Sequence, residues 1–287
     1  MRLAVTGGTG LVGRFIVEEA LAAGDAVTVL SRKRPAPGAF SGAVEHRPFT
    51  LGEAPELAGC DALVHAAFSH VPGRYRGGEG DDPDGFLAAN LDGTRRLFDA
   101  ARAAGVGRVV FLSSRAVYDG APPGTRLTED RALVPGSLYG RVKAEAEAAL
   151  AGSGVSGASL RATGVYGPAG PGQRHKWADL FADFLAGRPV APRAGTELHG
   201  ADLAAAVRLL LDRPGKLGAF NASDILLDRH DLLALVAEIT GCTHPLPERA
   251  ERAQISVMDT GRLEALGWRP GGWHRLKAAV PGMLAGV

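Results

Sequence analysis

The sequence has few cysteines and no long apolar run, and each absence excludes a class of protein. Its 2 cysteines, Cys60 and Cys242, are too few and too far apart for a disulfide framework or a metal-ligand set. No apolar stretch approaches the roughly 20 residues that span a bilayer. The N-terminus enters a predicted strand without the basic and apolar regions of a secretory leader. We therefore expect a cytoplasmic protein that binds no metal and no membrane.

Charge of one sign is also scarce. The chain has 32 Lys and Arg against 31 Asp and Glu, so its formal net charge of +1 gives no electrostatic basis for binding nucleic acid. The composition, 46% hydrophobic and 22% charged, is ordinary for a globular protein. A chain of 287 residues can form one large domain or two modest ones. The 40 glycines stand between periodic segments, and we find no internal repeat.

A strand, a glycine-rich turn and a helix follow one another at the start of the chain. Residues 3–5 are apolar, residues 6–10 read Thr-Gly-Gly-Thr-Gly, and helical spacing begins directly afterwards. The N–H groups and dipole of such a helix end attract anions. Gly7 and Gly10 would let the backbone approach a pyrophosphate, and Gly13 would let the helix pack closely on the strand. A glycine turn can also be purely structural, but this context favours dinucleotide binding. The expected contacts are Gly7, Thr9, Gly10, Leu11, Val12 and Gly13.

Strands and helices then alternate as far as residue 160. Further strands are predicted over residues 26–30, 43–47, 61–66, 108–113 and 155–160. Helices are predicted over residues 51–57, 84–104 and 137–150. This alternation predicts an α/β fold, a Rossmann-type doubly wound parallel sheet whose ligand lies at the carboxyl ends of the strands. Residues 68–83 form a long polar loop of the kind that is often functional.

The rhythm changes after residue 166. Helices are predicted over residues 175–187, 202–211, 228–240 and 260–267, with a short strand at 220–221. These elements indicate a smaller C-terminal substrate-binding lobe. We therefore expect an NAD(P)-binding domain over residues 1–165 and a substrate lobe over 166–287, with part of 199–222 returning to the first domain.

The end of the second strand bears on the choice of dinucleotide. NAD sites usually have an acid there, about 20 residues after the glycines, to bind the ribose 2′-hydroxyl. This chain has Ser31 followed by Arg32, Lys33 and Arg34. Basic side chains pair with a 2′-phosphate, although a solvated basic loop has the same composition. The missing acid favours NADP as cofactor, with NAD the alternative, and Ser31, Arg32 and Arg34 as contacts.

Two further patterns carry chemistry. Tyr139 and Lys143 are four residues apart on a predicted helix, so their side chains share a face. A lysine cation favours the phenolate and makes tyrosine a usable acid/base near neutral pH, although an amphipathic surface helix has the same spacing. Ser113 and Ser114 end the fifth strand, where a hydroxyl could bind a substrate oxygen.

Taken together, these motifs resemble those of the extended short-chain dehydrogenases/reductases, in the NAD(P)-dependent epimerase/dehydratase family. The resemblance covers essentially the whole chain. Besides TGxxGxxG at residues 6–13 and YxxxK at 139–143, the matching segments are His65-Ala66-Ala67, Asn90 to Thr94, Ser113 to Tyr118, Arg161 to Pro168 and His199 to Leu203.

The resemblance implies a redox mechanism through NAD(P). Tyr139 would be the acid/base, Lys143 would tune it and bind ribose, and Ser114 would orient the reacting oxygen. Ala66, Ala67 and Ser113 would line the cofactor, whereas His65, Asn90, His199 and Asp202 would be structural. The expected substrate contacts are Ser69, His70, Ser114, Arg115, Arg174, His175 and Lys176. A homodimer through the helices over 84–104 and 137–150 is typical of this family.

Departures from the family pattern narrow the reaction. Arg115 and Ala116 stand where dehydratases of this family carry an Asp-Glu pair, which argues against 4,6-dehydration. Gly164 and Gly195 replace an asparagine and an arginine of the nucleotide-sugar epimerases. Residues 174–176 could supply replacement charges, or they could be a solvated helix start.

Three functions remain open. The first is an NAD(P)-dependent oxidoreductase or epimerase acting on a hydroxyl/carbonyl centre of a small polar substrate, for example a sugar derivative. The second is a nucleotide-sugar epimerase with retained NAD. The third is a non-catalytic NADP(H)-sensing protein, against which the complete Ser-Tyr-Lys set argues.

Overall fold

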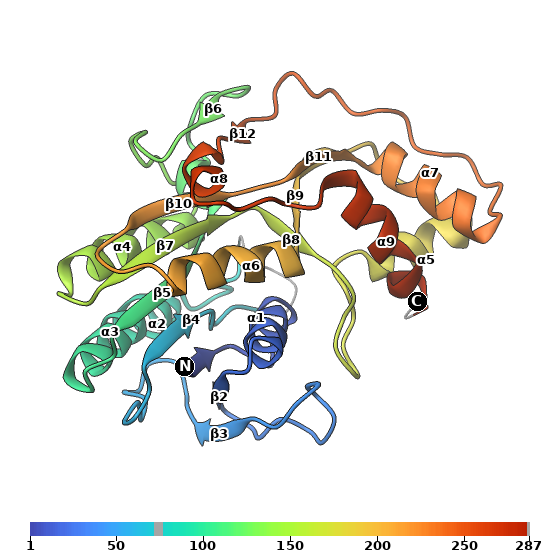
Figure 1. Ribbon diagram of the computed structural model, residues 1–287. Helices are drawn as coiled ribbons and strands as arrows, with labels where there is room; N and C mark the ends of the chain where they lie inside the picture. Colours follow the sequence, from blue (N-terminus) through green and yellow to red (C-terminus); the bar gives the residue numbers. More distant parts are fainter. Residues whose placement is uncertain (72–76, 286–287) are drawn as a thin grey trace.

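A seven-stranded sheet forms the centre of the molecule, for which the computed structural model describes residues 1–71 and 77–285 (Figure 1). The strand order is β10-β7-β5-β4-β1-β2-β3, and all neighbouring strands are parallel. The strands are β1 (Arg2–Thr6), β2 (Ala26–Ser31), β3 (Glu45–Pro48), β4 (Ala62–His65), β5 (Arg108–Ser114), β7 (Gly157–Ala162) and β10 (Gly218–Ala222). The predicted Rossmann-type doubly wound parallel sheet is confirmed.

Helices cover both faces of this sheet because its strands are apolar on both sides. In β1, Leu3 and Val5 belong to one buried cluster, and Ala4 belongs to another. Helices α1 (Leu11–Ala22) and α6 (Gly200–Leu211) contribute to the first cluster, and α3 (Gly93–Ala103) and α4 (Leu138–Gly152) contribute to the second. Such burial on both faces explains why the strands read as continuous apolar runs.

The helix predicted over residues 84–104 forms in three parts. An α-helical turn, α2 (Pro83–Leu87), leads into a π-helical segment (Ala88–Asp92), and α3 continues from there. Asn90 lies within the π-helical segment. Such segments are rare and often occur at functional sites.

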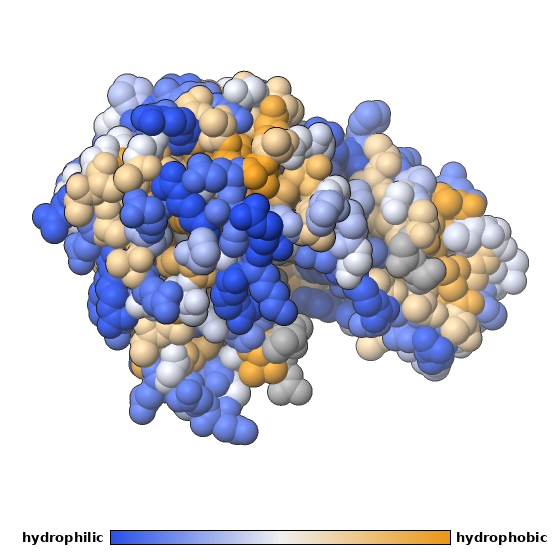
Figure 2. Space-filling view, turned by 90° about the horizontal axis from the view of Figure 1, so that it is seen from below, coloured by the Kyte–Doolittle hydropathy of each residue, from blue (hydrophilic) through white to orange (hydrophobic). Residues whose placement is uncertain are grey.

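A second, three-stranded sheet lies beside the carboxyl end of β7. It has the order β11-β9-β8 and consists of β8 (Gly164–Tyr166), β9 (Ala194–His199) and β11 (Ile225–Asp228). Around it pack α5 (Ala178–Leu185), α7 (Arg229–Thr240) and α9 (Gly272–Leu284). In the space-filling view this helical part projects from one side of the larger body, and hydrophilic residues predominate where the two meet (Figure 2). The domain boundary at residue 165 stays a prediction.

Two small elements complete the structure. Strand β6 (Arg126–Leu127) pairs with β12 (Val257–Met258), and α8 (Gly261–Ala265) follows β12. The helix predicted over residues 51–57 is wrong. That segment contains only a bridge between Leu51 and Glu53, and Pro55 cannot donate the hydrogen bond that a helix interior requires.

A buried ion pair joins α4 to the sheet. Arg161 of β7 is 4% exposed and Glu147 of α4 is 8% exposed. The Arg161 Nη2 and Nε atoms lie 2.6 and 3.1 Å from Glu147 Oε2. The Ser113 hydroxyl donates to the same carboxylate. Each charge is therefore paired and hydrogen-bonded, as buried charges must be.

We expect the variant Arg161→Met to lower the free energy of unfolding by about 3–5 kcal/mol, because it leaves the Glu147 charge buried without its partner. The double variant Arg161→Met/Glu147→Leu should recover most of this loss, since it removes both charges. Urea denaturation of the three proteins measures the effect. Equal losses in the single and double variants would contradict the explanation.

Candidate functional site

The glycine turn after β1 permits backbone contacts that side chains would prevent. Gly7 has a φ of +69°, and a Cβ at this position would lie 2.7 Å from the Ala67 nitrogen. A Cβ at Gly13 would overlap the Gly7 carbonyl oxygen. Because both residues lack a Cβ, α1 and the segment after β4 can close tightly around the turn.

The N-terminus of α1 has free hydrogen-bonding capacity. Gly10 is its N-cap, no side chain in the described part of the chain caps the helix, and its first turn contains no acid. In contrast, the Ser137 side chain caps α4 by accepting from the Gly140 N–H. Uncapped N–H groups at a helix start form an anion site.

The position of the turn also fits a dinucleotide. Strand β1 lies between β2 and β4, so the strand order reverses there, and the crevice opens at the carboxyl ends of β1 and β4. Gly7 and Ala67 meet in this crevice, with Ala66 beside them. Leu11 and Val12 are half-buried in the first turn of α1. The geometry of residues 7–13 therefore suits the pyrophosphate of NAD(P).

The segment over 167–173 reaches back to the glycine turn. Gln173 Nε2 donates to the Thr9 carbonyl oxygen at 2.7 Å, and Arg14 Nη2 donates to the Pro168 carbonyl oxygen at 2.8 Å. Neither contact was predicted from the sequence, because no local pattern relates residues about 160 positions apart.

His65 is a structural residue in a continuous hydrogen-bond chain. The Thr6 hydroxyl accepts from the Ala67 N–H at 3.1 Å and so donates to His65 Nδ1 at 2.7 Å. His65 Nε2 donates to the Thr94 hydroxyl at 2.9 Å, which in turn donates to the Asn90 carbonyl. Burial lowers the pKa of His65 to about 3, and the nearby Lys143 charge adds to this effect. The imidazole is therefore neutral and fixes the backbone of Ala67.

Asn90 holds the segment that follows β4. Its Oδ1 accepts from the Ser69 N–H at 2.7 Å, and its Nδ2 donates to the Ser69 carbonyl at 2.8 Å. His70 lies next and bonds the Val71 carbonyl through Nδ1. Residues 72–76 of the predicted loop over 68–83 lie outside the described part of the chain.

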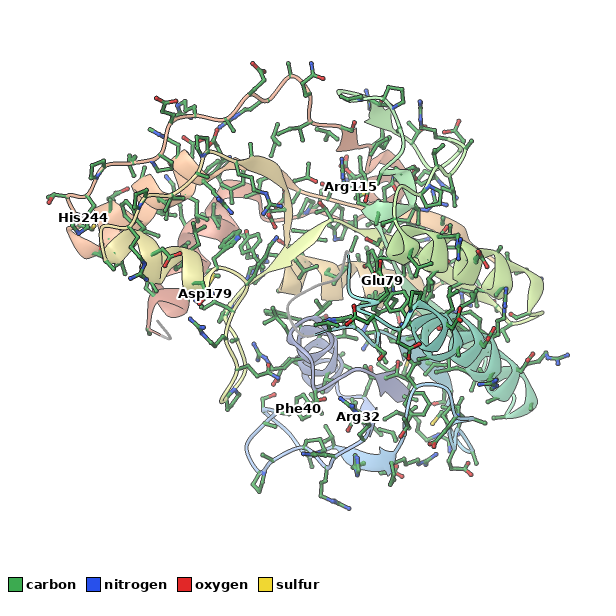
Figure 3. The ribbon with its side chains drawn as sticks, turned by 180° about the vertical axis from the view of Figure 1, so that it is seen from behind. Arg32, Phe40, Glu79, Arg115, Asp179 and His244 are labelled. Carbon is green, nitrogen blue, oxygen red and sulfur yellow. The ribbon has the colours of Figure 1, made fainter. Side chains whose placement is uncertain are left out.

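The end of β2 carries the predicted basic cluster. The Ser31 hydroxyl donates to the Lys33 carbonyl at 2.8 Å, which forms a tight turn. Arg32, labelled in Figure 3, and Arg34 are exposed. Within residues 1–71 and 77–285 neither has an ion pair. Their guanidinium groups remain available to an anionic ligand.

A backbone contact holds the start of the helix that carries Tyr139 against the segment that Ser114 caps. Ser114 ends β5 and caps the 3-10 helix (Arg115–Tyr118), where its Oγ accepts from the Ala116 N–H at 3.1 Å. This bond leaves the hydroxyl hydrogen able to donate. A Cβ at Gly140 would overlap the Ala116 carbonyl oxygen, so the first turn of α4 packs directly on this segment. The glycine inside YxxxK was the signal for this contact, and the sequence analysis did not use it.

Lys143 is buried among aromatic rings. The residue is 5% exposed, and its Nζ donates to the Leu112 carbonyl at 2.7 Å. The Nζ lies 4.6, 4.8 and 5.9 Å from the ring centroids of Phe68, Phe111 and Tyr139. Burial lowers the pKa of Lys143 to about 7, and the charge of Glu147 opposes this shift. Phe68 is a member of the site that the sequence analysis missed.

The remaining predicted residues are more scattered. Ser113 donates its hydroxyl to Glu147, inside the protein. The guanidinium of Arg115 contacts Asp119 and the Ser256 carbonyl, close to the two-stranded sheet (Figure 3). The cofactor and substrate roles of these two residues stay predictions.

Residues 174–176 do not act as one group. Arg174 forms an exposed ion pair with Asp179 at 2.7 Å. His175 is buried, and its ring lies 5.4 Å from that of Phe181. Only Lys176 turns toward the second sheet, where it pairs with Glu197.

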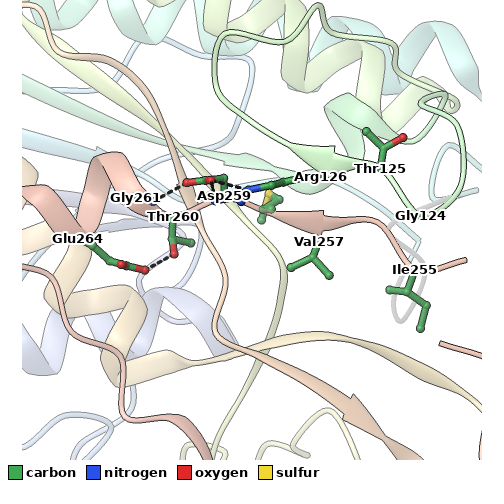
Figure 4. A pocket seen from close by; sticks show the side chains of 10 residues that line it. Gly124, Thr125, Arg126, Ile255, Val257, Asp259, Thr260, Gly261 and Glu264 are labelled. Atoms are coloured by element: carbon green, nitrogen blue, oxygen red, sulfur yellow. Dashed lines mark hydrogen bonds and ion pairs between the residues drawn. The ribbon is translucent and has the colours of Figure 1, made fainter. Parts of the chain in front are cut away.

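A cavity of about 420 Å³ lies between β6, β12 and α8, and Arg126, Asp259 and Glu264 are among its lining residues (Figure 4). It contains none of the predicted site residues. Within residues 1–71 and 77–285, no group of three or more His, Cys, Asp or Glu could hold a metal ion. In the same part of the chain, no helix is long and apolar enough to cross a membrane.

Comparison with known proteins identifies the family. The model of the NAD dependent epimerase/dehydratase family matches residues 3–223. The chain belongs to this family. It is therefore an NAD(P)-dependent enzyme of the extended short-chain dehydrogenase/reductase type.

Individual relatives match over most of their length. UDP-glucose 4-epimerase of Streptomyces lividans is 30% identical, with 93% of this chain and 90% of that protein covered. A dTDP-glucose 4,6-dehydratase of Mycobacterium tuberculosis is 31% identical over 76% of this chain and 70% of its own. The structure of MoeE5 in complex with UDP-glucuronic acid and NAD is 25% identical, covers all of both chains and has a TM-score of 0.81.

The low pKa of Lys143 predicts a pH-dependent stability. With a native pKa of about 7, below the 10.5 expected for the unfolded chain, only the unfolded chain keeps this proton at intermediate pH. Stability should therefore rise with pH, by up to about 1.4 kcal/mol per pH unit from this residue alone. Conversely, the stability decreases as the pH is lowered from 10.5 toward 7.

Lys143→Met removes the titrating group. The gain in unfolding free energy of the variant over the wild type should be largest below pH 7 and shrink steadily toward pH 10. Chemical denaturation across this range measures it, and other titrating groups cancel in the difference. A difference that does not change with pH would refute the shifted pKa.

Proposed function

We propose that this enzyme oxidises or reduces a hydroxyl/carbonyl centre of a small polar, sugar-derived substrate, with Tyr139 as acid/base, Lys143 as its tuning cation and Ser114 as the orienting hydroxyl. The observation that carries the proposal is the contact between Gly140 and the Ala116 carbonyl. It holds the first turn of α4 against the segment that Ser114 caps, at the same sheet edge as the glycine turn.

Each residue has a distinct task. Bound at residues 7–13, NAD(P) would take up or return hydride at its nicotinamide. The Ser114 hydroxyl donates to the substrate oxygen, and the Tyr139 phenol gives or takes the proton at that oxygen. The Lys143 ammonium would stabilise the phenolate, and it carries this charge at pH values below its own pKa of about 7. The Phe68 and Phe111 rings around Lys143 exclude water, which strengthens this effect.

The names of the relatives support a sugar-derived substrate, because they include UDP-glucose 4-epimerases and dTDP-sugar enzymes. Epimerisation requires that the oxidised substrate be reduced again before the cofactor leaves, so it would need a retained dinucleotide. Arg115 and Ala116, in place of the Asp-Glu pair expected from the family resemblance, argue against dehydration.

Tyr139→Phe tests the mechanism. Removal of the phenolic hydroxyl should lower turnover by at least about 100-fold, the usual contribution of a general acid/base, while dinucleotide affinity stays within about twofold because the ring remains. Turnover is measured by NAD(P)H absorbance and by sugar product analysis with UDP-glucose and UDP-galactose.

The same assay distinguishes the proposed enzyme from a non-catalytic binding protein. A non-catalytic NADP(H)-sensing protein would bind the dinucleotide but show the same background turnover in the wild type and in the variant. That result would refute the catalytic roles of Ser114, Tyr139 and Lys143.

We also propose NADP as the preferred cofactor. The exposed Arg32 and Arg34 and the absence of an acid at Ser31 support this choice, whereas the NAD in the MoeE5 structures supports the alternative. We expect NADP⁺ to bind about tenfold more tightly than NAD⁺, the worth of one charge-assisted hydrogen bond. Arg32→Glu should reverse this preference by repelling the 2′-phosphate.

Nucleotide titration of both proteins decides between the cofactors. Lys216→Glu, a charge reversal at an exposed lysine before β10, is the control and should leave the ratio unchanged. A wild type that binds NAD⁺ more tightly, or a ratio that Arg32→Glu leaves unaltered, would rule out the NADP assignment.

The homodimer through α3 and α4 stays a prediction. The exposed side of this helix pair carries ion pairs between Arg95 and Glu145 and between Arg141 and Glu145.

A further inference from the structure

An ion pair lies in the part of the molecule that the second sheet adds to the site. Lys176 precedes α5, Glu197 is in β9, and Lys176 Nζ contacts Glu197 Oε2. Their side chains are 28% and 12% exposed. Burial lowers the pKa of Lys176 and raises that of Glu197, and each partner opposes the shift of the other. Apolar residues could fill this space at less cost in desolvation, so packing alone does not account for the pair.

The polar atoms of the pair occupy the space that a side chain at position 164 would fill. Gly164 begins β8, and a Cβ there would overlap both Lys176 Nζ and Glu197 Oε2. The polar atoms of the pair therefore lie directly against bare backbone. A side chain at position 164 would displace them.

Both partners are held in place by their neighbours. Trp177, which follows Lys176, stacks on Tyr166 with the ring centroids 4.9 Å apart, and Lys176 Nζ lies 5.8 Å from the Trp177 ring centroid. On the other side, the Thr163 hydroxyl donates at 2.7 Å to the carbonyl of Thr196, the residue before Glu197. These contacts restrict the positions of both polar groups.

The register of the large sheet places the pair near the proposed reaction centre. Ser114 of β5 pairs with Ala162 of β7, and Gly164 is two residues further along the chain. Two residues span at most about 7 Å, and paired strands lie about 4.8 Å apart. Gly164, against which the pair lies, is therefore within about 12 Å of Ser114, a separation that one bound sugar derivative can span.

We propose that Lys176 and Glu197 bind an uncharged, hydroxyl-bearing part of the substrate and select it over a carboxylate. The inference rests on the proposed function. Glu197 neutralises Lys176, so the pair gives an anion no net attraction. Lys176 keeps N–H donors and Glu197 keeps an acceptor oxygen, side by side, and neighbouring sugar hydroxyls match both.

Within residues 1–71 and 77–285, the only other cation that shifts the pKa of both Lys176 and Glu197 is Arg193, which is exposed at the approach to β9. Water and salt screen its charge. The close contacts that a substrate meets are those of the pair itself.

UDP-glucose and UDP-glucuronic acid are suitable probes, because they differ only by a hydroxymethyl group against a carboxylate. Calorimetric titration of the wild type, loaded with the dinucleotide that it binds more tightly, should give at least about tenfold tighter binding of UDP-glucose, the worth of one disfavoured charge. Glu197→Gln leaves Lys176 as an unpaired cation and should remove this preference by strengthening UDP-glucuronic acid binding. Lys176→Gln leaves an unpaired carboxylate and should widen the preference.

Glu238→Gln is the matched control, because Glu238 is an exposed glutamate of α7 with no ion pair among the described residues. It should keep the wild-type ratio. Thermal unfolding checks that each variant is folded, and the opposite expected directions of Glu197→Gln and Lys176→Gln exclude a general loss of structure as the explanation.

Three results would overturn the inference: tighter binding of UDP-glucuronic acid by the wild type, a ratio that neither variant changes, or no binding of either sugar by protein that still binds its dinucleotide. Turnover by wild type but not by Tyr139→Phe would, in each case, leave the proposed function intact. Equal turnover by the wild type and by Tyr139→Phe would instead contradict the proposed function.

Discussion

Close approach of one backbone to another is the constraint on which this site depends. Gly7 lets the turn after β1 touch the segment after β4, Gly13 lets α1 close on the turn, and Gly140 lets α4 lie on the segment after β5. Each contact would be blocked by a single Cβ. Together they bring the glycine turn, the segment that Ser114 caps and the first turn of α4 to one edge of the sheet, where the proposed catalytic side chains lie.

Burial gives two ionisable residues of α4 opposite environments. Glu147 is surrounded by Arg161 and Ser113, which satisfy its charge. Lys143, one helical turn earlier, has a carbonyl and aromatic rings but no ion-pair partner among the described residues, so its charge remains poorly compensated. Arg161 engages Glu147, and the proposed action of Lys143 on Tyr139 depends on this division of partners. A structural ion pair would thereby influence the electrostatics of the neighbouring site.

The sequence predicted those features that depend on local patterns. Apolar runs such as residues 3–5 and 26–30 identified the strands of the large sheet, and glycine spacing identified the turn. The strands β8, β9 and β11 were missed because they are short and only partly apolar, and their pairing is between distant segments. Lys176 was predicted as a substrate contact together with Arg174 and His175. Nothing in the sequence indicated that Glu197 would be the partner of Lys176, or that Arg174 would face solvent.

The path of the chain between the two sheets has a consequence for cooperativity. After β7 the chain enters the second sheet at β8, returns through α6 and β10 to the first, and leaves again for β11. A fragment that ends near residue 165 would lack an edge strand and one covering helix of the large sheet. Neither sheet is encoded by one continuous segment, so the molecule cannot be divided into two halves that are each complete, and its parts must assemble in a single folding unit.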